Sequence, residues 1–224
     1  MNKFAIGCGG LLVIIIFFAF IIGLFFWGTY NRLVGLQQGV DTQWAQVQTV
    51  YQRRADLIPN LVNTVAGAAN FEKSTLTEVT NARASVGRVQ LDPNKAPTDA
   101  KQLQEFQAAQ GQLSNALSRL LVVAENYPQL KATENFQGLQ AQLEGTENRI
   151  SVERNKFNTV VQDYNVAVKR FPTNMIAGMF GFPPRPFFAA QQGAENAPTV
   201  NFNFGSPAPA APAASPAATA AATP

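Results

Sequence analysis

Residues 4–27 read FAIGCGGLLVIIIFFAFIIGLFFW and contain neither a charged residue nor a proline. As an α-helix this stretch would be about 36 Å long, because each residue adds about 1.5 Å. The hydrocarbon core of a bilayer is about 30 Å thick, and a single segment inside it must satisfy its own backbone hydrogen bonds, as a helix does. Trp27 and Tyr30 follow where amphipathic rings favour the membrane–water interface. The sequence therefore predicts a transmembrane anchor over residues 1–29, with the remaining chain on one membrane face.

Two other interpretations of this stretch are weaker. A buried helix of a soluble protein rarely stays apolar on every side for about six turns. The apolar region of a cleaved signal peptide is shorter and ends at small residues, whereas Phe25, Phe26 and Trp27 occupy that place here. Lys3 precedes the apolar stretch, and Arg32 is the one cation within about 20 residues after it. This bias slightly favours a cytoplasmic N-terminus.

Composition excludes several classes of site. The chain has 224 residues and a formal net charge of +3, but only 14% of its residues are charged. No dense run of lysine or arginine occurs, so no nucleic-acid binding is predicted. The chain has no histidine, and its single cysteine, Cys8, lies in the apolar stretch. A Cys/His zinc site, a Cys–His nucleophile and a Ser–His–Asp triad are thereby excluded for the outer domain. We predict no catalytic residues, no cofactor and no metal.

Beyond the anchor, apolar residues recur every three or four positions as far as Pro172, as in helices that pack against one another. At Pro59 we expect a kink, or a break with Pro59 in the first turn of a second helix that reaches about residue 89. The next two helices should end at Pro128 and Pro172, because the residue before a proline is pushed out of the α region. The predicted fold class is all-α, with an elongated, antiparallel, up-and-down four-helix-type bundle over residues 30–172.

Loops and the C-terminal part have distinct signals. Residues 91–97, LDPNKAP, predict a loop, after which Thr98 or Asp99 can cap the next helix by accepting a hydrogen bond. Residues 173–188 form an apolar, proline-broken segment that we expect to pack on the bundle or on the membrane surface. Residues 189–224 are rich in Ala and Pro and lack the apolar side chains that offset ordering entropy. They predict a disordered, low-complexity tail.

Two long stretches resemble a known family. YNRLVGLQQGVDTQWAQVQTVYQRRADLIPNLVNTV (residues 30–65) and AENYPQLKATENFQGLQAQLEGTENRISVERNKFNTVVQDYNVAVKRFP (residues 124–172) are similar to the two halves of the LemA family of bacterial membrane proteins. The combination of RRADLIPNLV, ENYPQLKA and TENRI is highly specific. The resemblance implies an N-terminal anchor and an elongated antiparallel helical bundle, and it brings no established activity. It places the chain in the bacterial inner membrane, and the charge bias places the bundle outside the cytoplasm.

Polar and charged residues gather near Pro59, at the end of the third predicted helix and in the middle of the last one. These candidate site residues are Arg53, Arg54, Asp56, Asn60, Glu125, Tyr127, Glu147, Asn148, Arg149 and Arg154. One interpretation is a polar layer that receives a peptide or charged groups of a partner protein. The other is that these groups fix helix register and satisfy backbone groups freed by Pro59.

Because no catalytic residue set is present, the sequence predicts a non-enzymatic, membrane-anchored scaffold or adaptor that binds other envelope proteins. An alternative is a structural membrane protein that assembles with further copies of itself into a homo-oligomer. Ala19 and Gly23, a small-xxx-small pair in the anchor, favour that alternative weakly. A third hypothesis is an adaptor or substrate of a membrane protease, for which the tail would be the entry point.

Overall fold

The computed structural model describes residues 2–68, 71–89 and 91–189, with side chains described from residue 13 onward. The predicted tail beyond residue 189 and the side chain of Cys8 lie outside the described part. Within it the chain forms helices and no strand, so the all-α prediction is confirmed. The helices are α1 (Asn2–Ala66), α2 (Lys73–Arg88), α3 (Ala100–Ala124), α4 (Pro128–Lys131), α5 (Glu134–Lys169) and α6 (Thr173–Phe180).

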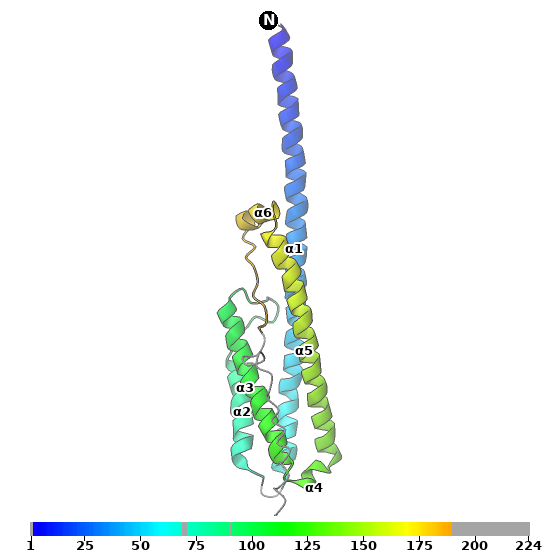
Figure 1. Cartoon of the computed structure of the whole chain (residues 1–224), viewed down its shortest axis with the longest axis vertical. Helices are drawn as coiled ribbons and strands as arrows, with labels where there is room; N and C mark the ends of the chain where they lie inside the picture. The colour runs from blue at the N-terminus through cyan, green and yellow to red at the C-terminus, as the bar shows by residue number, and fades with distance from the viewer. Residues whose placement is uncertain (1, 69–70, 90, 190–224) are drawn as a thin grey trace, which may run out of the picture. The chain divides into compact units, whose positions relative to one another are not determined.

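Four long helices alternate in direction (Figure 1). α1 runs from the N-terminus to the far end of the bundle, α2 returns, α3 runs back, and α5 returns again beside α1. α1 packs against α5 along the bundle, and α2 packs against α3 in the half away from the N-terminus. This arrangement is the predicted antiparallel, up-and-down four-helix bundle.

α1 is a single helix of 65 residues that contains both the apolar N-terminal stretch and the first helix of the bundle. In the described part of the chain it is the one helix long and apolar enough to cross a membrane, by length and composition. Residues 13–25 are exposed throughout, and Phe26 is the first residue of this stretch to pack against the bundle core. The anchor and the bundle therefore share one continuous helix.

Pro59 lies inside α1 and does not end it, so of the two expected outcomes, a kink or a break, the break was wrong. Ile58 and Leu61, on either side of it, are buried in one apolar cluster that holds the helix together. Because proline has no N–H, the carbonyl oxygen of Ala55 loses its helical donor. Arg83 of α2 donates from Nε to that oxygen over 3.3 Å. The helix expected from Pro59 onward is thus reduced to α2.

The apolar core is divided into two clusters along the bundle. The proximal core, nearer the anchor, includes Leu33, Val40, Trp44, Val47, Tyr51, Leu103, Phe106, Ile150, Phe157, Val161, Tyr164, Phe182 and Phe188. The distal core includes Ile58, Leu61, Val65, Val79, Leu113, Leu117, Leu120, Leu130, Phe136 and Leu143. The four long helices and Leu130 of α4 build the distal core, whereas α1, α3, α5 and the C-terminal segment supply most of the proximal one.

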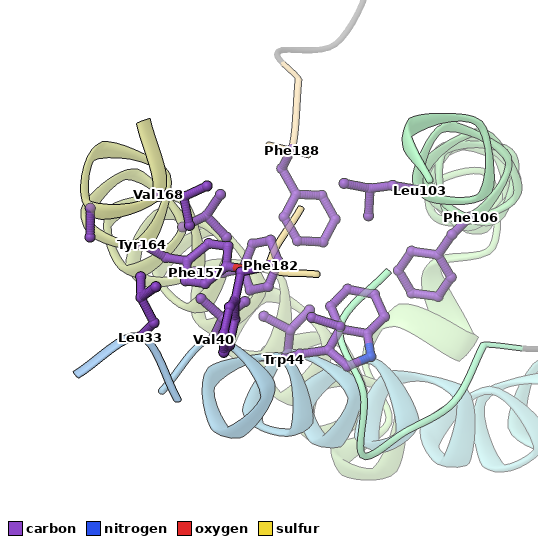
Figure 2. Close-up of a cluster of buried hydrophobic side chains, with 14 of the residues drawn as sticks. Leu33, Val40, Trp44, Leu103, Phe106, Phe157, Tyr164, Val168, Phe182 and Phe188 are labelled. Carbon is purple, nitrogen blue, oxygen red and sulfur yellow. The ribbon is translucent and has the colours of Figure 1, made fainter. Parts of the chain in front are cut away.

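The C-terminal segment after α6, residues 182–189, packs on the bundle. α6 ends at Gly181, whose φ of +72° is a left-handed conformation that glycine adopts without strain. The chain then turns back along the bundle, and Phe182 and Phe188 enter the proximal core. Figure 2 shows Phe188 pointing into the space between α5 and α3, close to Trp44. The segment therefore fills the part of the bundle that the shorter helix α2 leaves uncovered.

The cap of α3 gives a simple test of a sequence prediction. The Asp99 carboxylate accepts a hydrogen bond of 2.8 Å from the backbone N–H of Lys101. Asp99→Ala should lower the free energy of unfolding by about 1 kcal/mol, because one free N–H of the first turn loses its acceptor. Thermal unfolding followed by circular dichroism in detergent would measure it, with Thr98→Ala at the exposed neighbouring position as control. Equal losses in the two variants would contradict the role of Asp99.

Candidate functional site

A buried arginine occupies the centre of the polar layer that separates the two cores. Arg54 is 1% exposed. From Nη1 it donates to Ser114 Oγ over 2.8 Å and to Glu147 Oε1 over 2.5 Å, and from Nη2 to the side-chain oxygen of Gln110. Its guanidinium carbon lies 5.2 Å from the centre of the Tyr51 ring. One side chain of α1 thus joins α3 and α5.

On α1, α3 and α5, a polar residue replaces an apolar one in the buried stripe, and the three replacements lie at the same level of the bundle. Arg54 lies between Tyr51 and Ile58 on α1, and the polar residues of α3 and α5 occupy equivalent intervals. A slipped register would bury the guanidinium among apolar side chains without acceptors, at a large cost in free energy. The Glu147 side chain is 44% exposed and so also reaches water. The layer has the geometry of a register-fixing contact, with Arg54 already bonded inside the bundle.

Tyr51, beside this layer, has a shifted pKa. Burial raises the pKa of its phenol above the ordinary value of 10.0, and the positive charges of Arg154 and Arg54 oppose the shift. Burial also raises the pKa of Tyr164 in the proximal core. The folded chain therefore holds these protons more tightly than the unfolded chain does. The stability that this difference provides is complete below about pH 10 and is lost as the pH rises above it.

Tyr51→Phe should make thermal stability less dependent on pH in that alkaline range. The variant has no phenol to titrate, so the difference in melting temperature between pH 9 and pH 11 should shrink by a measurable part, with Tyr164 still contributing. Tyr30→Phe, at an exposed position near the anchor, is the control. If both variants follow the unmodified protein across this range, burial of the Tyr51 phenol does not control its stability.

The structure does not bring all the predicted polar residues together. Arg154 donates to the Ala189 carbonyl over 3.0 Å and stacks on the Phe188 ring at 4.9 Å, so it holds the C-terminal segment. Glu125 lies 3.9 Å from Lys131 at the distal end of the bundle. The other residues of the set that lie exposed on the bundle surface, besides Glu125, are Arg53, Asp56, Asn60, Asn148 and Arg149. Among the charged residues of the set, Arg54 and Glu147 alone form a shared contact in the part described.

Sequence reasoning missed a second buried guanidinium, that of Arg185 in the C-terminal segment. Arg185 is 3% exposed, and its Nη1 donates to the Ala96 carbonyl over 2.5 Å. Its Nη2 lies 3.9 Å from Asp41 Oδ1, which also accepts from the Ala96 N–H over 2.9 Å. The sequence did contain a signal for this contact, because Arg185 is a single cation in an apolar, proline-flanked run. A charge buried with such a run needs a partner.

Two asparagines of α5 hold the backbone of the same segment. Asn165 donates to and accepts from the backbone of Arg185, both at 2.8 Å. Asn158 does the same with Phe188, at 3.1 and 2.9 Å. Seven helical residues rise about 10.5 Å and three extended residues span about 10 Å, so the two spacings match. These contacts fix the segment antiparallel to α5.

At the distal end of the bundle, α1 ends and α4 joins α3 to α5 (Figure 1). The residues there line an open cleft of about 640 Å³. Tyr127, one of the predicted residues, lines it, and its ring packs at 4.9 Å on Phe71. Pro128 opens α4 at its first turn, and Leu130 anchors it in the distal core. The lining residues are Thr64, Gly67, Ala68, Asn126, Tyr127, Pro128, Gln129, Leu130, Thr133 and Asn135. None of them is charged; they offer amides, hydroxyls and apolar surface.

The volume of the cleft and the residue types that line it match a binding site better than a catalytic site. Sites for small ligands commonly have volumes of about 300–1,000 Å³ and combine apolar surface with a few polar groups. General acid–base catalysis needs a positioned titratable group, and the described lining contributes Tyr127 alone among such groups. In the described residues, no three His, Cys, Asp or Glu side chains gather as a set that would hold a metal ion.

Comparison with known proteins shows the family of this chain. The model of the LemA family matches residues 43–202. The magnetosome protein MamQ of Magnetospirillum gryphiswaldense is 26% identical over 174 residues, which cover 71% of this chain and 64% of that protein. MamQ 1 of Paramagnetospirillum magneticum is 25% identical with the same coverage, and protein LemA of Metamycoplasma hominis is 24% identical over 166 residues, covering 73% and 71% of the two chains. The chain thus spans about two thirds of these relatives, 64% of MamQ. The family match covers most of the bundle, so this membrane-associated helical protein belongs to the LemA family.

Proposed function

We propose that this protein is a non-enzymatic scaffold or adaptor of the bacterial inner membrane, whose distal cleft binds an uncharged segment of another envelope protein. The observation that carries the proposal is the cleft, which is open and lined by amide, hydroxyl and apolar groups. Backbone amides of a bound peptide would find partners in Asn126, Gln129 and Asn135. Small apolar side chains would rest on Ala68 and Leu130.

The position of the cleft supports an adaptor role. Thr64, at its edge, follows Trp27 by 37 residues of one continuous helix, a distance of about 55 Å along α1. The buried Arg54 contacts hold the helices of the bundle in register between these two points. A rigid support of this length would present the cleft to soluble domains of envelope proteins rather than to the lipid.

Orientation is the part of the proposal that rests on charge bias. Lys3 before the anchor favours an N-terminus in the cytoplasm and a bundle outside it. Asn94→Cys in a Cys8→Ala background places one thiol at an exposed loop position. A membrane-impermeant maleimide should label it in intact cells or spheroplasts. Protection until lysis would instead place the bundle and its partner in the cytoplasm.

Site-specific photocrosslinking tests the cleft. With p-benzoylphenylalanine at Gln129, which lines the cleft, irradiation of intact cells should give one adduct of defined mass with another envelope protein. The same probe at Gln142, exposed on α5 outside the cleft, should give none. An adduct between two differently tagged copies of this chain would support the self-assembling alternative instead. No adduct at Gln129 would contradict both versions of cleft binding.

Two threonines of α1 provide a matched pair for filling the cleft. Thr64 lines the cleft, and Thr49 does not; each donates its hydroxyl to the carbonyl four residues earlier. Thr64→Trp should reduce the Gln129 adduct about tenfold or more, because the indole occupies volume that the partner needs. Thr49→Trp should leave the adduct unchanged. Equal adduct yields in the two variants would show that the partner binds outside the cleft.

A further inference from the structure

α6 exposes an unusual amount of apolar surface for a helix of eight residues. Met175 is 62% exposed, Met179 72% and Phe180 52%, and Phe171, just before the helix, is 75% exposed. The opposite face of α6 is buried in the proximal core through Ile176 and its neighbour Ala177. Large apolar side chains grouped on one exposed face mark a surface that contacts a partner or a membrane.

The position of α6 along α1 indicates which partner covers this face. Phe180 and Phe182 pack on the Tyr30 ring, and their ring centres lie 5.1 and 5.7 Å, respectively, from the centre of that ring. Phe26, the first residue of the anchor to lose exposure, packs against the cluster that holds Ile176. α6 therefore lies at the level of Trp27, which is where the apolar stretch leaves the lipid. Figure 1 shows α6 crossing the anchor-facing end of the bundle.

Charge around α6 is compatible with lipid headgroups. Lys169 and Arg170 precede the helix and are exposed, and Arg32 is exposed on α1 two residues after Tyr30. α6 itself contains no charged residue. An apolar face with cations beside it is the pattern of a helix that lies in the interface plane.

We propose that α6, together with Phe171, lies in the headgroup–acyl boundary of the membrane as a second contact beside the anchor. Phe171, Met175 and Met179 insert into the lipid, while Lys169 and Arg170 remain among the phosphates. This contact prevents the bundle from turning about the axis of α1, so the distal cleft faces one fixed direction. The proposal concerns lipid contact alone and does not depend on what the cleft binds.

Electron paramagnetic resonance on the full chain tests it. A nitroxide is attached to Met179→Cys in a Cys8→Ala background, and the protein is placed in nanodiscs of phosphatidylcholine and phosphatidylglycerol. Relaxation of the nitroxide by oxygen, which concentrates in lipid, is compared with its relaxation by a water-soluble nickel chelate. Gln162→Cys, exposed on α5 seven residues or about 10.5 Å before the end of that helix, is the aqueous control. Met175→Cys is a second lipid-facing position.

The expected result is that the Met179 and Met175 labels are relaxed several-fold more by oxygen than by nickel, and the Gln162 label several-fold more by nickel. Nickel accessibility at the two methionine positions equal to that at Gln162 would show an α6 in water and overturn the proposal. Protection from both reagents would mean that protein, such as a second copy of this chain, covers α6, which also overturns it. The substituted methionines are exposed, and circular dichroism spectra would verify that the bundle remains folded.

Discussion

Trp44→Ala is expected to lower the free energy of unfolding by about 3–5 kcal/mol, the range for truncation of a fully buried aromatic side chain. Trp44 is 0% exposed, and its ring lies 5.7 Å from those of Phe106 and Phe157 and 6.1 Å from that of Phe188. Its Nε1–H donates to the Asp92 carbonyl over 3.0 Å. Alanine would leave a cavity where α1, α3, α5 and the C-terminal segment meet (Figure 2), and an acceptor without its donor.

Thermal unfolding in detergent would measure this loss as a fall in melting temperature of roughly 6–20 °C for a domain of this size. The second tryptophan of the chain, Trp27, is 73% exposed and provides the control Trp27→Ala, which should leave the bundle's stability nearly unchanged. Trp44→Phe keeps an aromatic ring but removes the Nε1–H donor, so its stability should lie between those of Trp44→Ala and Trp27→Ala. A change below about 1 kcal/mol for Trp44→Ala would contradict the packing described here.

Arg54→Ala should cost about 3 kcal/mol, because it leaves acceptors of α3 inside the bundle unpaired and removes buried side-chain volume. The variant removes the donor to Gln110 and Ser114 inside the bundle and leaves a cavity in their place. Glu147 is less affected, because its half-exposed carboxylate can turn to water. The penalty therefore comes mainly from the α3 acceptors and the lost volume.

The neighbouring arginine supplies the matched control. Arg53 is exposed one position away on the same helix, so Arg53→Ala should change stability by no more than about 0.5 kcal/mol. Arg54→Met retains most of the side-chain volume without any donor and separates cavity from lost hydrogen bonds. Chemical denaturation of the three variants in the same detergent would compare them. Equal stability of Arg53→Ala and Arg54→Ala would show that the polar layer adds nothing to the fold.

Much of the helical architecture could be predicted because it depends on the local periodicity of apolar residues. Apolar residues at three- and four-residue spacing indicate the four long helices, and Asp99 is a recognisable cap. Arg54 and Glu147 stand out in the sequence as members of polar clusters on two of these helices. Their partners on α3, Gln110 and Ser114, do not, because uncharged polar residues are common on helix surfaces and carry no signal of burial.

Features that depend on contacts between distant segments could not be predicted. Pro59 suggested a break by its local chemistry, but packing on both sides and the bond from Arg83 keep α1 continuous. The C-terminal segment has no periodicity, and what places it is a set of backbone contacts to Asn158 and Asn165. The distal cleft arises from the way α4 joins its neighbours, which no residue spacing reveals.

The lipid-facing stretch and the first helix of the bundle form one continuous helix, so α1 acts as a lever arm without a hinge. Membrane helices tilt by about 20° on average, and a 55 Å arm tilted by that angle displaces its tip sideways by about 19 Å while lowering it by only about 3 Å. Changes in bilayer thickness alter the tilt of a spanning helix. The lateral reach of the distal cleft would therefore vary with membrane thickness, while its height above the surface would remain nearly constant.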